Sequence, residues 1–425
     1  MPKYMGFYKS LNKLQMSLIF ICLGILQFPF IREITYFNKL KICLLILIFL
    51  IIVLSFWKLI ISRYLIDKSF LILSAVVMLI YTFSFLNVYM YKEYSSFGNQ
   101  IIFMLFPLII GMIMANDKRK ISAINFNGML VAVVSIQVIC AVLFKIMQID
   151  FSQFSMNTLH AYKTLYTAEG NARLAGTLGH PIVLAFVCIP VFFLSYQSFK
   201  ITKKKLYLVL FLLVSVVIMQ TFSRGTWIGI LGALFLAFML SNIRSKFKII
   251  SLSTIVLIAA LLYNSLIETT PVLDRLGSLF NSGDNVSVSH RTLMFTWGIE
   301  RYLNHDLSVF FGIGYGLANT LAEKIMPIDG FPVIDNSFIS MFIELGVINM
   351  VLVMSLVFRS LFNSYKSDKV YLYILVAMLL TIFTFDVSSW HLPSFLFWLI
   401  IGYTTIEKNN RNVVTVEKQE EQFRK

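Results

Sequence analysis

The stretch "QTFSRGTWIG", residues 220–229, decides how this chain folds. It places a single arginine, Arg224, between apolar runs at 206–222 and 226–240, with almost no loop between them. Apolar runs of this kind predict helices that cross a membrane. A charge so close to lipid costs several kcal/mol, so it is usually retained for a function. Arg224 is therefore a candidate functional residue at the end of a helical hairpin.

The composition of the whole chain is that of a membrane protein. Of 425 residues, 58% are hydrophobic and 13% are charged, and the mean hydropathy is +0.80. A soluble protein carries charge on about a quarter of its residues. The sequence therefore predicts an all-α integral membrane fold, because its apolar runs are long enough to cross a bilayer as helices of roughly 20 residues.

These runs predict about 12 transmembrane helices. Their approximate ranges are 14–31, 42–62, 70–91, 101–115, 122–147, 178–198, 206–222, 226–240, 249–266, 336–358, 370–386 and 392–405. The first run lacks a small-residue cleavage site and is followed by further runs. We therefore expect it to remain as an anchor instead of being removed as a signal peptide.

The basic residues predict the orientation of the helices. With the N-terminus in the cytoplasm, 24 of the 36 Lys and Arg residues fall on the cytoplasmic side, in agreement with the positive-inside rule. Both termini are then cytoplasmic, and Arg224 lies on the extracytoplasmic side. The net charge of +15 reflects this topology and does not indicate nucleic-acid binding.

Two extracytoplasmic loops are long enough to carry a function. The expected organisation is transmembrane helices 1–5 at 1–147, a second extracytoplasmic loop with helices 6–9 at 148–266, a long extracytoplasmic loop at 267–335, helices 10–12 at 336–405 and a cytoplasmic tail at 406–425. In the long loop, 290–303 predicts an amphipathic helix. The glycine-rich stretch 309–321 is expected to lie against the membrane surface or to fold back over the bundle. The long loop is too apolar for disorder, so we expect a partly helical lid.

Arginines are enriched on the predicted extracytoplasmic side. Arg173, Arg291 and Arg301 join Arg224 in the loops that flank helices six to ten, whereas most cytoplasmic basic residues are lysines. Guanidinium groups bind phosphates through paired hydrogen bonds and stay charged near lipid. These arginines are candidate phosphate ligands. The alternative is that they pair with carboxylates or reach lipid headgroups.

All five histidines also fall on the extracytoplasmic side. His180 and His290 stand close to the arginines in the sequence, which indicates acid–base or anion chemistry there. Neither the histidines nor the four cysteines have metal-ligand spacing. The sequence therefore predicts no metal site, and four buried thiols without a disulfide.

A third polar group follows the long loop, in "VIDNSFISMFIELGVI", residues 333–348. Asp335 and Asn336 stand just before a predicted span, and capping of that helix would explain Asp335. Capping does not explain Glu344, which the span carries into the membrane. Such a carboxyl should face the bundle interior or a partner.

Together these motifs resemble the O-antigen polymerase and O-antigen ligase superfamily, over roughly residues 171–350. The features that carry the resemblance are Arg173 with "GTLGHP", the "TFSRG" turn, Arg291 early in a loop helix, the "FGIGYG" segment and "DNSFISMFIELG". Ligases of this family typically carry histidine at the position of Asp335. The chain is therefore more similar to the polymerases.

The resemblance implies a metal-independent membrane glycosyltransferase that needs no cofactor. It would polymerise oligosaccharide repeat units, carried on undecaprenyl pyrophosphate, into O-antigen or a capsular or exopolysaccharide. This would occur on the outer side of the bacterial cytoplasmic membrane. The expected partners are lipid-linked glycans, the bilayer, a chain-length regulator and a flippase.

The resemblance also implies roles for the candidate residues. The expected catalytic residues are Arg224, Asp335, Arg291 and His290. Arg224 would stabilise the departing pyrophosphate, and Asp335, ahead of His290 and His180, would be the base. The expected ligands of the pyrophosphate or glycan are Arg173, His180, Asn336, Arg301 and Glu344.

Two other functions stay open. An O-antigen ligase, which transfers the finished glycan to a final acceptor, would use the same residues. Twelve spans with both termini inside also suit a polysaccharide transporter or flippase. Transporters, however, usually gather their polar residues at mid-membrane, whereas here they gather at the extracytoplasmic surface.

Overall fold

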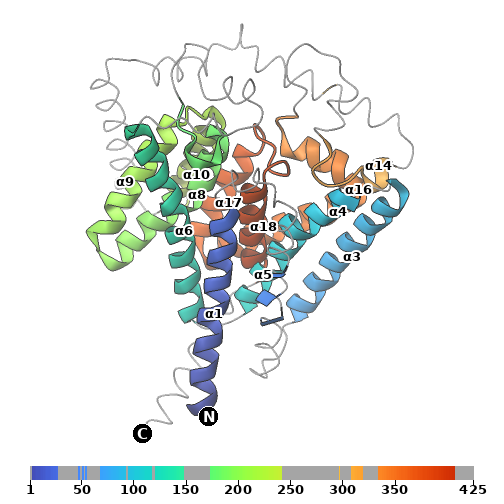
Figure 1. Ribbon diagram of the computed structural model, residues 1–425, viewed down its shortest axis with the longest axis horizontal. Coiled ribbons are helices and arrows are strands. Elements are labelled where there is room, and N and C mark those ends of the chain that lie inside the picture. Colours follow the sequence, from blue (N-terminus) through green and yellow to red (C-terminus); the bar gives the residue numbers. More distant parts are fainter. Residues whose placement is uncertain are drawn as a thin grey trace.

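The computed structural model is a bundle of helices, from which the N-terminal helix extends downward in the view of Figure 1. The residues that the structure describes are 2–26, 68–91, 94–116, 120–147, 173–241, 308–318 and 334–406, with fragments at 46–47, 50–51, 53–54 and 296.

The described chain is helical. Its α-helices are α1 (Pro2–Leu26), α3 (Lys68–Tyr91), α4 (Tyr94–Gln100), α5 (Phe106–Asn116), α6 (Lys120–Ile146), α8 (Pro181–Thr202), α9 (Lys205–Gln220), α10 (Arg224–Met239), α14 (Ser308–Phe311), α16 (Ser337–Ser367), α17 (Lys369–Thr381) and α18 (His391–Thr405). A π-helix, η2 (Ile101–Leu105), and a short 3₁₀-helix, η4 (Gly176–Leu178), complete the set. No β-strand occurs in these ranges, so the predicted all-α class is confirmed for them.

Several of these helices can cross a membrane. Among the described residues, four stretches are long and apolar enough by length and composition: Ser96–Ala115, Phe126–Ile146, Pro181–Thr202 and Ser337–Ser367. Shorter apolar helices, including α9, α10 and α17, accompany them. The chain is thus a multi-pass membrane protein. The spans expected near 42–62 and 249–266 lie largely outside the described residues, and the number of 12 spans stays a prediction.

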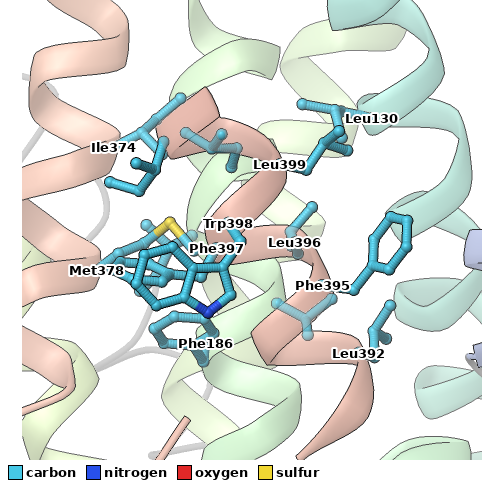
Figure 2. Packing of buried hydrophobic residues seen from close by; sticks show 14 of the residues in the cluster. Leu130, Phe186, Ile374, Met378, Leu392, Phe395, Leu396, Phe397, Trp398 and Leu399 are labelled. Carbon is cyan, nitrogen blue, oxygen red and sulfur yellow. The ribbon is translucent and has the colours of Figure 1, made fainter. Parts of the chain in front are cut away.

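The last helix, α18, lies at the centre of the bundle (Figure 1). Every residue from Leu392 to Thr405 is buried in the protein, as expected for a helix that is apolar on all sides. Figure 2 shows the side chains of α18 among Leu130 of α6, Phe186 of α8 and Met378 of α17, all in one buried cluster. Helices from distant parts of the sequence therefore share one core.

Glycines allow the closest helix contacts. A Cβ on Gly402 of α18 would overlap the carbonyl oxygen of Leu108 in α5, and a Cβ on Gly111 of α5 would overlap the carbonyl oxygen of Leu399. Small residues permit such backbone contact between membrane helices. Because backbone meets backbone at this crossing, a larger residue cannot be accommodated by a side-chain rotation.

Two predicted spans are interrupted. The span expected at 101–115 starts in α4 and passes through the π-helix η2 before α5. The span expected at 336–358 is the longer helix α16, which breaks at Gly346 with φ 74° and ψ 171°. Glycine adopts a positive φ without the steric cost that a Cβ brings. Apolar periodicity did not predict either interruption, because the apolar runs continue through both.

The cysteines agree in part with the prediction. Cys22 and Cys188 are buried free thiols, whereas Cys43 lies outside the described residues. The prediction is wrong for Cys140, which is only partly buried. Its neighbours Ile139 and Leu143 are 50% and 47% exposed, because this face of α6 lies on the surface of the bundle.

We expect Gly402→Ala to lower the free energy of unfolding by about 1–3 kcal/mol, because the added methyl group forces α5 and α18 apart. Gly128→Ala in α6 is the matched control, since a Cβ there meets nothing within 4 Å and alanine favours the helix by roughly 0.5–1 kcal/mol. Thermal unfolding in detergent measures both variants. Equal stability of the two would mean that the α5–α18 contact is not tight.

Candidate active site at the helix ends

The turn between α9 and α10 holds Arg224 in place. Helix α9 ends at Gln220 and α10 begins at Arg224, so only three residues join them. Phe222 takes a φ of 50°, which is uncommon for a residue with a side chain. The hydroxyls of Ser223 and Thr226 lie 3.0 Å apart across the first turn of α10. Arg224 is therefore a partly buried cation on a fixed helix end.

Arg173 is fixed against the same turn. Its Nε donates a hydrogen bond of 3.0 Å to the carbonyl of Thr221. The N–H of the next residue, Leu174, donates to the carbonyl of Gln220 at 2.9 Å. The structure thus brings together Arg173 and Arg224, which the sequence had singled out separately.

His180 lies close to these arginines, just before α8. Its ring centroid is 4.9 Å from that of Trp390. Burial lowers the pKa of His180 to about 3, and the positive charge of Arg173 adds to this effect. The imidazole is therefore neutral near pH 7, so it contributes no positive charge to an anion site and is a weak base.

The loop between α17 and α18, residues 382–390, joins the elements of the site. Sequence analysis did not single it out. Thr384 of this loop lies against Gly225, where a Cβ would overlap its hydroxyl. Trp390, at the other end, lies beside His180. The loop therefore passes from the start of α10 to the start of α8.

The same loop is bonded to the start of α16. The hydroxyl of Ser337 donates to the carbonyl of Phe385 and accepts from the N–H of Val387, both at 2.7 Å. The N–H of Ser337 donates to the carbonyl of Ile382 at 2.9 Å. One serine therefore aligns the residues before α16 with the loop.

Asp386 is a buried carboxyl group in this loop, with 2% of its surface exposed. Its Oδ1 accepts from the N–H of Ser388 at 3.2 Å and from the Ser388 hydroxyl at 2.9 Å. The hydroxyl of Ser389 donates to Oδ2. Burial raises the pKa of Asp386, these hydrogen bonds oppose the rise, and the charge of Asp335 adds to it. Asp386 and Asp335 are therefore neighbours.

The helix cap before α16 differs from the expectation. Asn336, and not Asp335, is the capping residue: its Oδ1 accepts from the N–H groups of Phe338 and Ile339, at 2.9 and 3.3 Å. Either side chain could have served by type, since Asn and Asp cap equally well. The register of the helix decides between them and leaves the Asp335 carboxyl, which is partly buried, on the side of Asp386.

Glu344 lies inside the bundle with 1% of its surface exposed, as its position within a span requires. Its Oε1 accepts from the N–H of Ala318 at 3.2 Å. The carboxyl also lies near Asp386 and Ser388. Glu344 therefore connects the break in α16 with the loop that carries Asp386.

The glycine-rich segment covers this break. The N–H groups of Ile313 and Gly314 donate to the carbonyls of Ile343 and Glu344, both at 3.0 Å. These carbonyls stand next to the break at Gly346, where the regular helix ends. The described part of this segment, residues 308–318, thus folds onto the bundle, which is one of the two expected placements, and donates hydrogen bonds to the broken helix.

A comparison with known proteins identifies this part of the chain. Residues 208–354 match the sequence profile of the O-antigen ligase family. This part of the chain is similar to an O-antigen ligase domain. No curated protein matches the chain. The resemblance seen in the sequence is thereby confirmed at the level of the superfamily.

The O-antigen ligase domain contains Arg224, Asp335, Asn336 and Glu344. Arg173, His180 and the loop 382–390 lie outside it, although the structure places them at the same helix ends. Elements before and after the domain therefore complete the candidate site.

Three of the expected site residues are not described. His290, Arg291 and Arg301, with the amphipathic helix predicted at 290–303, lie outside the described residues. Among the residues that are described, no group of three or more His, Cys, Asp or Glu side chains could hold a metal ion.

Sequence reasoning missed Asp386 and its two serines. A signal was present, because "FDVSSW", residues 385–390, is a short polar interruption between apolar runs. The predicted span at 370–386 absorbed the aspartate, whereas α17 ends at Thr381. Its place in the candidate site depends on contacts with distant residues, which a local pattern does not contain.

We expect acid to destabilise the protein through His180. The unfolded chain binds a proton at this residue below about pH 6.5, whereas the folded protein does so only near pH 3. Stability should therefore fall as the pH is lowered through this window, by up to about 1.4 kcal/mol per pH unit. His180→Gln should be less sensitive to acid between pH 6 and pH 4, measured by thermal unfolding in detergent. A parallel loss in both proteins would contradict the burial of a neutral imidazole.

Proposed function

We propose that the protein polymerises oligosaccharide repeat units that are linked to undecaprenyl pyrophosphate. The observation that carries the proposal is the convergence of Arg173 and Arg224 on one turn, inside or beside an O-antigen ligase family domain. Two guanidinium groups held near the membrane boundary suit a lipid-linked pyrophosphate, because they bind phosphate oxygens through paired hydrogen bonds.

The reaction is a displacement at the anomeric carbon of the donor glycan. The acceptor hydroxyl forms a bond to that carbon while the bond from the carbon to the pyrophosphate oxygen breaks. The lipid pyrophosphate leaves with the electron pair, and its growing negative charge is stabilised by Arg224 and Arg173. The positive end of the α10 helix dipole favours an anion at the same place.

The proton of the acceptor hydroxyl passes to a base, for which we propose Asp335. This carboxyl group lies near Asp386, and its charge adds to the rise in the pKa of Asp386. His180 is the weaker candidate, because burial keeps its pKa near 3. His290 stays an alternative base.

The remaining expected residues keep supporting roles in this proposal. Arg291 and Arg301 would add positive charge from the long loop, which would act as a lid at 267–335. Asn336 and Glu344 would shape the glycan-binding side of the site, where Asn336 caps α16 and Glu344 faces Asp386.

An O-antigen ligase is the second candidate function, and the description of the matched family favours it. A ligase would transfer the completed glycan from the same lipid pyrophosphate to a final acceptor. Asp335 favours the polymerase, since the resembling ligases carry histidine there. Both reactions would take place on the outer side of the bacterial cytoplasmic membrane, in a chain with 12 spans and cytoplasmic termini.

Arg224→Ala tests the proposal in the native host. We expect loss of the long-chain glycan ladder, with single repeat units left on the lipid carrier. Full-length glycans stranded on the carrier would instead identify a ligase. An unchanged glycan profile would exclude Arg224 from the reaction and would favour the transporter or flippase function. Electrophoresis of surface glycans and mass spectrometry of lipid-linked intermediates separate these results.

We also expect Arg224→Lys to lose activity nearly as completely as Arg224→Ala, by roughly 100-fold or more. Lysine keeps the charge but lacks the paired hydrogen-bond geometry. Lys204→Ala, an exposed position at the far end of α9, is the control and should keep normal activity. Polymerisation by purified protein measures the three variants, and wild-type rates for Arg224→Lys would contradict the phosphate-binding role.

A further inference from the structure

Helix α6 brings a third cation to the turn that holds Arg224. Lys145 stands in the last turn of α6, and its Nζ donates a hydrogen bond to Oε1 of Gln220. Gln220 is the last residue of α9, and its neighbour Thr221 accepts the hydrogen bond from Arg173. Three cations from three separate segments therefore surround one short turn.

One face of α6 builds this arrangement. Gln137, Ala141 and Lys145 follow one another at intervals of four residues, so they lie on the same side of the helix. The hydroxyl of Thr177 donates to Oε1 of Gln137 at 2.6 Å. Gly176 lies so close to Ala141 that a Cβ would be 3.1 Å from its methyl group. This face thus fixes the segment after Arg173 and contacts the end of α9.

The charges indicate what this place binds. Like charges that are gathered near lipid repel one another, and an anion between them removes this cost. An ammonium group has three N–H donors, of which the bond to Gln220 uses one. The start of α10 adds backbone N–H groups that have no partner within the helix. An anion with several negative oxygens matches this set.

We infer that Lys145 binds the same anion as Arg173 and Arg224, and that Gln220 is the positioning residue for its ammonium group. The identification of the anion as the pyrophosphate of a lipid carrier rests on the proposed function. Lysine near the end of a helix also interacts favourably with the helix dipole. That interaction explains a lysine in the last turn of α6, but it does not require the hydrogen bond to Gln220.

The inference makes the N-terminal part of the chain a part of the site. Lys145 lies outside the O-antigen ligase domain and in a region where the sequence resembles the superfamily only in its hydropathy. Its role follows from contacts between α6, α9 and the segment that begins at Arg173.

Calorimetric titration of the purified full-length protein in detergent tests this role. The two probes are inorganic pyrophosphate and a short-chain polyprenyl pyrophosphate. We expect Lys145→Met to weaken the binding of both roughly tenfold, the effect of one charge-assisted hydrogen bond. Lys145→Arg should keep binding within about threefold of wild type, because the charge and donors remain. Lys204→Met, at the far end of α9, should bind both probes normally.

Gln220→Glu provides a second test that preserves the shape of the contact. The new carboxylate still accepts the hydrogen bond from Lys145, but it neutralises the ammonium group and repels an anion. We therefore expect it to weaken both probes about as much as Lys145→Met. If the unfolding curve shows that Lys145→Met does not fold, the binding of both probes to Gln220→Glu tests the inference instead.

The outcomes separate this inference from the proposed function. Unchanged binding of both probes to Lys145→Met and Gln220→Glu would overturn the inference. Weaker binding of the lipid-linked probe alone would also overturn it, because Lys145 would then contact the lipid and not the pyrophosphate. Weakened binding of both probes in a protein without polymerase activity would support it while the proposed function fails. If the protein polymerises glycans and Lys145→Met has the wild-type KM for the lipid-linked donor, the proposed function stands and the inference is overturned.

Discussion

The candidate site depends on the hydroxyl group of Ser337. Its two hydrogen bonds, to the carbonyl of Phe385 and from the N–H of Val387, align the residues before α16 with the loop 382–390. That loop in turn contacts the start of α10 at Gly225 and the residue before α8, His180. Without this alignment, the carboxyl groups and the arginines would lie on helix ends with no fixed relation to one another.

The membrane explains why the glycine-rich segment lies where it does. A break in a helix leaves backbone carbonyls without partners, and this is costly away from water. At Gly346 the break is tolerated because N–H groups of Ile313 and Gly314 donate to the carbonyls just before it. The same arrangement brings Ala318 to Glu344. The same segment therefore gives hydrogen bonds to the backbone carbonyls before the break and to the buried carboxyl group of Glu344.

The site separates cationic groups from carboxyl groups along the loop 382–390. Positive groups gather at the turn between α9 and α10, whereas Asp335, Asp386 and Glu344 gather at the start and the break of α16. A displacement reaction that expels a pyrophosphate needs positive charge at the leaving group and a base at the attacking hydroxyl. The two groups of residues suit these two needs.

The sequence by itself determined the helical membrane class, most of the helices and the importance of Arg224, because these follow from apolar runs and from the cost of a charge near lipid. It also indicated the family, through motifs that lie close together in the chain. Only the tertiary structure decided that Asn336 and not Asp335 caps α16 and that α16 breaks at Gly346. It also decided that Asp386 lies near Asp335 and that Lys145 contacts the end of α9. Local patterns could not predict these features, since each depends on hydrogen bonds or packing between segments far apart in the sequence.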